Sequence, residues 1–249
     1  MLLEIACDSI QSVSAAIAGG AGRIELCASL LEGGTTPSFG FISTARKLSG
    51  IPLYVMIRPR GGDFVYSSAE REIMINDIRL CKELKADGIV LGILNKHGRV
   101  DTERVREMVE IARPLGVTFH RAFDLTADPF QSLEDVIACG CERLLTSGQS
   151  PSAESGAALI RDLELASAGR IKIMAGAGVR SSNVLQIVEH TDVSEVHMSA
   201  RAVVESEMIF RRDEVPMGSP GLSNYELNSV SVDQVRTVKQ LLDSLPKLS

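Results

Sequence analysis

Eight short apolar runs recur along the chain, spaced by about 20 to 35 residues, and stretches of helical period lie between them. Strands alternating with helices, without a run of hairpins, indicate parallel β-α units. Eight such units are what a closed (β/α)₈ (TIM) barrel needs, and an open doubly wound sheet is the alternative. The predicted strands are Leu2–Ala6, Arg23–Cys27, Leu53–Ile57, Gly88–Gly92, Val117–His120, Arg143–Thr146, Ile171–Ala175 and Ser194–Met198.

The chain length and the kind of apolar residue fit this architecture. A length of 249 residues is usual for one barrel domain, so we expect a single domain over residues 1–249. Hydrophobic residues make up 45% of the chain, but aromatic residues only 4%. The core must therefore be aliphatic, which suits parallel strands that are buried on both faces.

One connection is longer than a barrel requires. The stretch Glu207–Val230 separates the eighth strand from a last helix predicted at Val232–Leu245. We expect it to be an ordered lid or a contact between subunits, because it carries apolar anchors at Met208, Phe210, Met217, Leu222 and Tyr225.

Charge and cysteine content exclude several classes of protein. A net charge of −6 argues against binding nucleic acid or an anionic membrane. No apolar run approaches the roughly 18 residues of a membrane span, and the N-terminus lacks a basic signal-peptide region. Five cysteines are too few for a secreted disulfide scaffold of this size, so we expect a cytoplasmic protein.

Three polar residues on the strands are candidates for catalysis. Glu25 alternates with Ile24 and Leu26, which places its carboxylate inside the barrel, and Arg58 ends the third strand with a similar orientation. These two either take part in chemistry or form a structural ion pair. His120 ends the fifth strand facing the interior, where an imidazole can be a general acid or base or a metal ligand.

Loops at the carboxyl ends of the strands are predicted to bind an anion. The loop after the third strand carries Arg60 and two glycines, and Gly176–Gly178 follows the seventh strand, where barrels often bind phosphate. Gly176 and Gly178 lack the Cβ atoms that would block close approach. Ser147 and Ser199 follow the sixth and eighth strands and offer further donors.

Two cysteines end the first two strands, which as neighbours lie about 4.8 Å apart. Thiolates of Cys7 and Cys27 at that range could hold a soft ion such as Cu(I). The alternation of each strand complicates this, because Cys27 shares the inward face with Glu25 whereas Cys7 points outward. The alternative is two small buried apolar side chains.

Several of these segments together resemble the CutC family, and the resemblance runs from the first strand through the eighth. The matching segments are Leu3–Ser9, Arg23–Cys27, Glu32–Ser38, Ile57–Phe64 (IRPRGGDF), Val117–Asp124 (VTFHRAFD), Leu144–Gly148 and Met174–Val179. The resemblance implies a (β/α)₈ barrel with a role in copper homeostasis that binds Cu(I) through Cys7 and Cys27. It also implies a homo-oligomer, either a dimer or a tetramer.

The residues leave two other interpretations open. The chain could be an enzyme for a small phosphorylated or carboxylated metabolite, with Glu25 and His120 as acid and base. Arg58 and Arg60 would then clamp the anion, and Gly176–Gly178 would hold a phosphate. The other interpretation is an oligomeric scaffold in which the carboxyl ends of the strands no longer have a function. Whether the chain catalyses a reaction is left open by the sequence.

Overall fold

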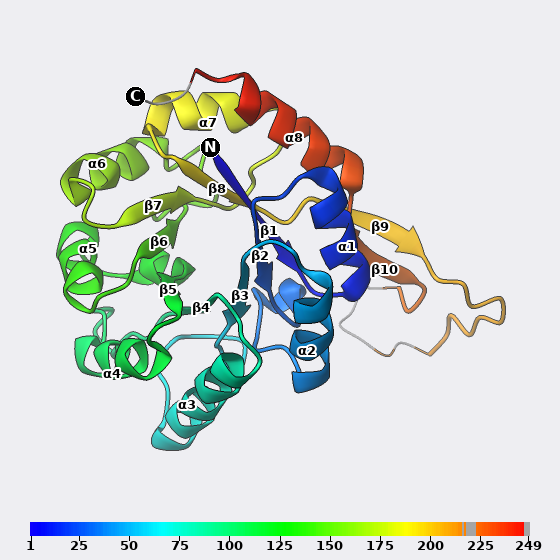
Figure 1. Ribbon diagram of the computed structural model, residues 1–249, viewed down its shortest axis with the longest axis horizontal. Coiled ribbons are helices and arrows are strands. Elements are labelled where there is room, and N and C mark those ends of the chain that lie inside the picture. Colours follow the sequence, from blue (N-terminus) through cyan, green and yellow to red (C-terminus); the bar gives the residue numbers. More distant parts are fainter. Residues whose placement is uncertain (216, 218–222, 247–249) are drawn as a thin grey trace.

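The computed structural model describes residues 1–215, 217 and 223–246. Eight parallel strands close into a barrel in chain order, and helices surround them (Figure 1). The predicted barrel is confirmed, and every strand end lies within one residue of the one expected. The strands are β1 (Leu2–Cys7), β2 (Arg23–Leu26), β3 (Leu53–Met56), β4 (Gly88–Leu91), β5 (Gly116–Phe119), β6 (Arg143–Thr146), β7 (Lys172–Ala175) and β8 (Glu195–Met198).

The outer ring consists of helices, most of which begin at a residue whose side chain caps the first turn. Ser67 and Glu70 form a reciprocal capping box, and Asp128 precedes a proline at the first turn of its helix. The helices are α1 (Ile10–Gly19), α2 (Phe39–Leu48), α3 (Ser68–Glu83), α4 (Thr102–Ala112), α5 (Pro129–Ala138), α6 (Ala157–Ser167), α7 (Val184–Thr191) and α8 (Val232–Ser244), with short 3₁₀ turns η1 (Leu30–Glu32) and η2 (Arg121–Leu125).

The apolar core lies between the barrel and these helices. Leu3 and Ile5 of β1 are fully buried in it, and so are Ile24 and Leu26 of β2. The alternate residues of the same strands are Glu4, Arg23 and Glu25, which are also buried but are polar. The two-residue period therefore directs ionisable side chains into the barrel, which is where the site is built.

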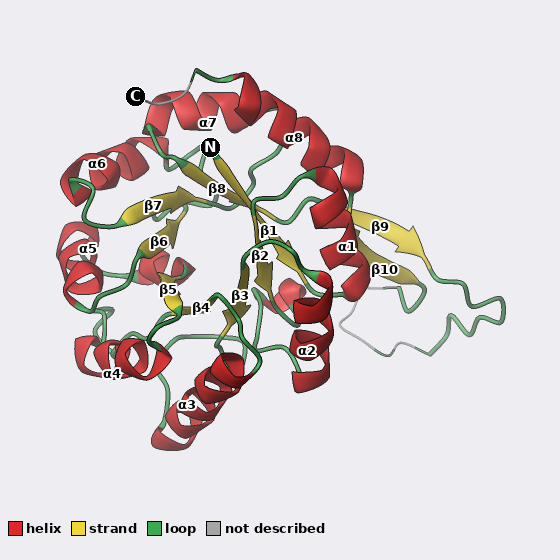
Figure 2. Ribbon diagram, viewed as in Figure 1, coloured by secondary structure: helices red, strands yellow, loops and turns green. Residues whose placement is uncertain are grey.

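The long connection after β8 forms an element that the sequence did not predict. Strands β9 (Arg201–Glu205) and β10 (Glu226–Val230) pair antiparallel as a ribbon that projects beyond the helical ring (Figure 2). The segment that follows β9 leaves apolar side chains in solvent, with Ile209 98% and Phe210 68% exposed. The expected anchor Leu222 lies outside the described residues. No helix in the described ranges is long and apolar enough to cross a membrane.

Candidate functional site

The amino ends of the strands hold a closed network of ion pairs, which we call the barrel base (Glu4, Arg23, Arg143 and Glu195). Arg23 binds Glu4 and also Glu195, with its Nη2 2.6 Å from Glu195 Oε2. Arg143 reaches the same Glu195 carboxylate with its Nε and Nη2, the latter at 3.2 Å. The two guanidinium groups thus neutralise the two carboxylates, and all four side chains are at least nine-tenths buried.

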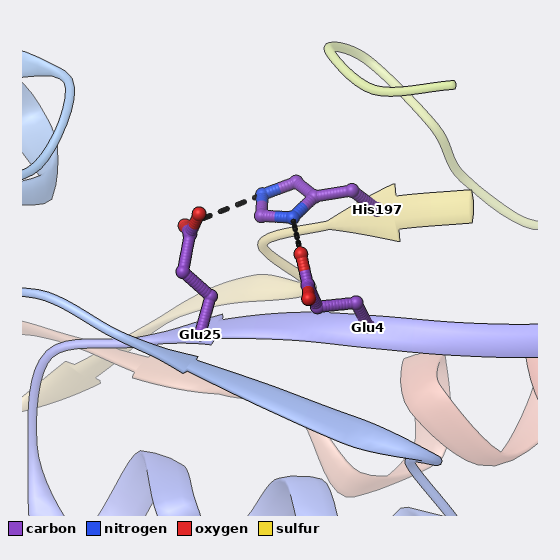
Figure 3. A group of neighbouring side chains, drawn as sticks. All are labelled: Glu4, Glu25 and His197. Atoms are coloured by element: carbon purple, nitrogen blue, oxygen red, sulfur yellow. Dashed lines mark hydrogen bonds and ion pairs between the residues drawn. The ribbon is translucent and has the colours of Figure 1, made fainter. Parts of the chain in front are cut away.

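His197 of β8 lies above this base, between two carboxylates (Figure 3). Its Nδ1 is 2.8 Å from Glu4 Oε1 and its Nε2 is 3.8 Å from Glu25 Oε2. Since a carboxylate only accepts hydrogen bonds, Nδ1 carries the proton and donates it to Glu4. The ligand atoms of Glu4, Glu25 and His197 lie within 4.8 Å of one another, so the group has the spacing of a metal centre.

The two carboxylates beside His197 have opposite electrostatics. Burial alone would raise the pKa of Glu4, but Arg23 and then His197 outweigh it and lower that pKa to about 2. The pKa of Glu25 is raised, because burial exceeds the attraction of His197 and Glu4 adds repulsion. Its Oε1 has no hydrogen-bond partner among the described residues. The surroundings of Glu4 therefore stabilise its negative charge, whereas those of Glu25 oppose a negative charge.

A cavity of about 280 Å³ opens above Glu25 at the carboxyl ends of the strands. We call it the mouth pocket, and its polar lining includes Glu25, Arg58, His120, Gly178, His197 and Ser199. All three catalytic candidates predicted from the sequence thus meet around one cavity.

Arg58 does not form the ion pair with Glu25 that was one of its two predicted roles. Its Nη1 donates to the carbonyl oxygens of Glu32 at 2.8 Å and Gly34 at 2.9 Å, and its Nη2 donates to that of Gly62 at 2.8 Å. Its Nε has no partner, and no carboxylate lies within 4.0 Å in the described ranges. The side chain is a buried cation held in place by neutral carbonyls.

His120 has a fixed tautomer. Its Nδ1 accepts a hydrogen bond from the backbone N–H of Ala122 at 3.1 Å, so the ring proton is on Nε2. That buried Nε2 has no partner among the described residues. Burial and then the charge of Arg58 lower the pKa of His120 to about 3. The ring is therefore a neutral N–H donor, and Gly92 leaves the space it occupies, since a Cβ there would lie 2.5 Å from it.

The residues predicted to bind an anion divide into two groups. Gly178 and Ser199 line the mouth pocket, but Arg60, Ser147 and Gly176 do not. Arg60 turns outward to Glu70 and Asp63. The Ser147 hydroxyl is engaged with Asp124 at 2.9 Å. Asp124 thereby fastens the loop after β6.

The two cysteines predicted to hold copper face different sides of the barrel wall. Cys7 packs with Leu3 and Ile5 in the core beneath the helices, whereas Cys27 packs inside the barrel with Tyr54 and Met56. The Cys27 Sγ is 3.3 Å from Glu25 Oε2. Burial raises the pKa of both thiols, and for Cys27 the Glu25 carboxylate raises it further. Both are thiols rather than thiolates at neutral pH.

Sequence reasoning singled out Glu25 but not the network beneath it. That network comprises Arg23, Arg143 and Glu195 together with Glu4, and His197 lies above it. Strand parity could have found them, because Arg23 shares the face of Glu25 and Glu195 shares the face of His197.

Comparison with known proteins agrees with this fold. The model of the CutC family matches residues 1–202. A family protein CutC from Parabacteroides distasonis is 50% identical over 234 residues, which cover 94% of this chain and 96% of that protein. The copper homeostasis protein cutC homolog of Mus musculus is 47% identical over 241 residues, covering 96% of this chain and 89% of that protein.

Solved structures extend the agreement to three dimensions. A CutC protein from Streptococcus agalactiae has a TM-score of 0.76 and 36% identity, covering 79% of this chain and 97% of that one. Thiamine phosphate pyrophosphorylase from Pyrococcus furiosus, at 15% identity and a TM-score of 0.61, covers 97% of this chain and 95% of that one and shares the fold alone. The chain belongs to the CutC family.

Proposed function

We propose that this protein binds copper as Cu(I) in the cytoplasm and takes part in copper homeostasis. Family membership supports this role, since the relative from Mus musculus is named for copper homeostasis. The observation that carries it is the position of the Glu25 carboxylate, which lines the mouth pocket and lies between a thiol and an imidazole. Cys27 Sγ is 3.3 Å from Glu25 Oε2, which is 3.8 Å from His197 Nε2.

This donor set fits copper. Cu(I) prefers soft thiolate ligands, and imidazole also suits copper. Cys27 supplies the sulfur and His197 the nitrogen, while Glu25 offers a negative charge that offsets the charge of the ion. Because the Cys27 thiol is protonated before binding, copper must displace a proton, so affinity rises with pH.

Cys7 is the second ligand that the sequence predicts, but it is less well placed. It lies on the adjacent strand, where its carbonyl accepts the backbone N–H of Cys27 at 2.9 Å. Its side chain packs on the helix side of the wall. Cys7 joins the site only if the end of β1 rotates, so in this proposal it contributes less than Cys27.

Anaerobic titration of the reduced protein with Cu(I), in competition with a chromogenic chelator, tests the assignment. Cys27→Ser is expected to abolish the tight site and Cys7→Ser to weaken it. Cys139→Ser is the control, because that residue follows α5 on the opposite face of the barrel. Unchanged affinity and stoichiometry in the Cys7→Ser, Cys27→Ser double variant would refute a thiolate copper site.

We further propose that the protein is a homo-oligomer, a dimer or a tetramer, assembled through the β9–β10 ribbon. Exposed apolar side chains support this, with Val203 on the ribbon and Ile209 and Phe210 on the segment that follows β9. An open groove of about 990 Å³ lies along the ribbon, and its lining includes Val204, Met208 and Leu227. Light scattering is expected to give a dimer or tetramer that Ile209→Glu, Phe210→Glu dissociates, and a monomeric parent protein would contradict the assignment.

A further inference from the structure

The mouth pocket contains more positive charge and more free donors than a copper site can use. Arg58 and Arg201 both line it, and neither has a carboxylate within 4.0 Å among the residues the structure describes. Arg58 is 4% exposed and its Nε–H is unpartnered, as is the Nε2–H of His120. Burying a guanidinium without a counter-charge costs free energy, and a nearby cation such as Cu(I) would increase that cost.

We propose that the mouth pocket also binds a small phosphorylated metabolite. Its phosphate lies on the backbone of the loops after β7 and β8, beside Arg201. An oxygen acceptor at its other end, a carbonyl or a hydroxyl, receives the hydrogen bonds of Arg58 Nε and His120 Nε2.

The phosphate end is assigned from the backbone of two loops. Ala177 and Gly178 have φ angles of 78° and 71°, so the chain turns sharply just after β7. The N–H groups of Ala177, Gly178, Val179 and Ser199 find no acceptor within the described part of the chain, and all four residues line the pocket. Successive free N–H groups at such a turn form an anion-binding concavity, and barrels bind phosphate at this position.

The acceptor end is assigned from His120 and Arg58. Their free N–H groups are buried across the mouth from Gly178, on the loops after β5 and β3, and the Phe64 ring contacts both side chains. The low pKa of about 3 keeps His120 neutral, so that Nε2 remains a donor and Nδ1 an acceptor over the physiological range. An uncharged donor polarises a carbonyl or binds a hydroxyl without adding charge.

The size of the pocket limits the ligand. A cavity of about 280 Å³ has room for a phosphate and a short chain of carbons, but not for a nucleotide. The class is therefore a monophosphate of a small sugar or polyol. This inference does not depend on copper, because none of the phosphate or acceptor donors is among the copper ligands proposed above.

Isothermal titration calorimetry tests the proposal with three probes: inorganic phosphate, ribose 5-phosphate and ribose. We expect phosphate to bind weakly, ribose 5-phosphate to bind more tightly, and ribose not to bind. Arg201→Met and His120→Phe are each expected to weaken ribose 5-phosphate about tenfold or more. Arg201 is exposed, so its variant tests the charge without risk to folding.

The matched control is Arg60→Met, since Arg60 is on the same loop as Arg58 but is held outside the pocket by Glu70. It is expected to bind ribose 5-phosphate as the parent does. Cys27→Ser is expected to lose copper and keep ribose 5-phosphate, which separates the two proposals. The inference is overturned if neither phosphate probe binds at about 10 mM, or if Arg60→Met weakens binding as much as Arg201→Met.

Discussion

The base and the mouth of this barrel contain the same kinds of residue in opposite states. At the base, Arg23 and Arg143 neutralise Glu4 and Glu195 within one closed set of ion pairs. At the mouth, Arg58 Nε, His120 Nε2 and Glu25 Oε1 are buried and have no partner within the described ranges. The two layers are only a few residues apart along the strands.

The difference separates structural charge from functional charge. A buried ion pair that is fully hydrogen-bonded fixes one arrangement of strands, and breaking it leaves a lone buried charge. A buried polar group without a partner lowers stability, and natural proteins keep such groups where a ligand completes them. We therefore expect variants at the base to affect folding, and variants at the mouth to affect binding.

The largest effect is expected from Arg23→Met at the base. This change removes one of the two arginines that neutralise Glu4 and Glu195. The free energy of unfolding should therefore fall by about 3–5 kcal/mol. Urea denaturation followed by circular dichroism measures it. Arg170→Met, which breaks an exposed pair with Glu134, is the control and should change the midpoint little. Equal losses in both variants would contradict the structural role of the base.

A smaller effect is expected from His120, and it depends on pH. The unfolded chain protonates this histidine near its ordinary pKa of 6.5, but the folded protein does so only near 3. Stability is therefore lost as pH falls below 6.5, by about 2 kcal/mol between about pH 7 and pH 5. In His120→Phe that part of the loss should be absent. Urea midpoints of the parent protein and of His120→Phe, measured across this pH range, test this. Parallel losses of stability in the two proteins would contradict the account.

The smallest effect is expected from Arg60→Met. Arg60 is partly exposed and paired with Glu70 and Asp63, so its removal should leave the urea midpoint and the binding of ligands at the mouth almost unchanged. A clear loss of ligand binding in this variant would show that the working surface extends beyond the mouth pocket.

The sequence predicted the barrel well because the apolar runs mark each strand locally. Both ends of the predicted strand Arg143–Thr146 agree with the structure. The ribbon was missed because its strands, Arg201–Glu205 and Glu226–Val230, pair across a long connection without a tight turn to signal it.

The site was predicted less completely. Alternation along the strand placed Glu25 correctly inside the barrel, and the same rule placed His120. The partners of Arg58 could not be predicted, because they are backbone carbonyls of loop residues that no side-chain pattern marks. The state of His120 also depends on one backbone hydrogen bond that forms only in the folded chain.

The most direct test makes the same substitution in both layers. Glu4 and Glu25 lie on adjacent strands beside one histidine, yet the pKa of Glu4 is lowered and that of Glu25 is raised (Figure 3). The folded protein therefore favours a charge on Glu4 and opposes one on Glu25. The measurement is the free energy of unfolding of Glu4→Gln and Glu25→Gln in urea at about pH 8.

The account predicts that Glu4→Gln loses about 3 kcal/mol or more, whereas Glu25→Gln is as stable as the parent protein or more stable. Equal losses in the two variants would contradict the division between a structural base and a functional mouth.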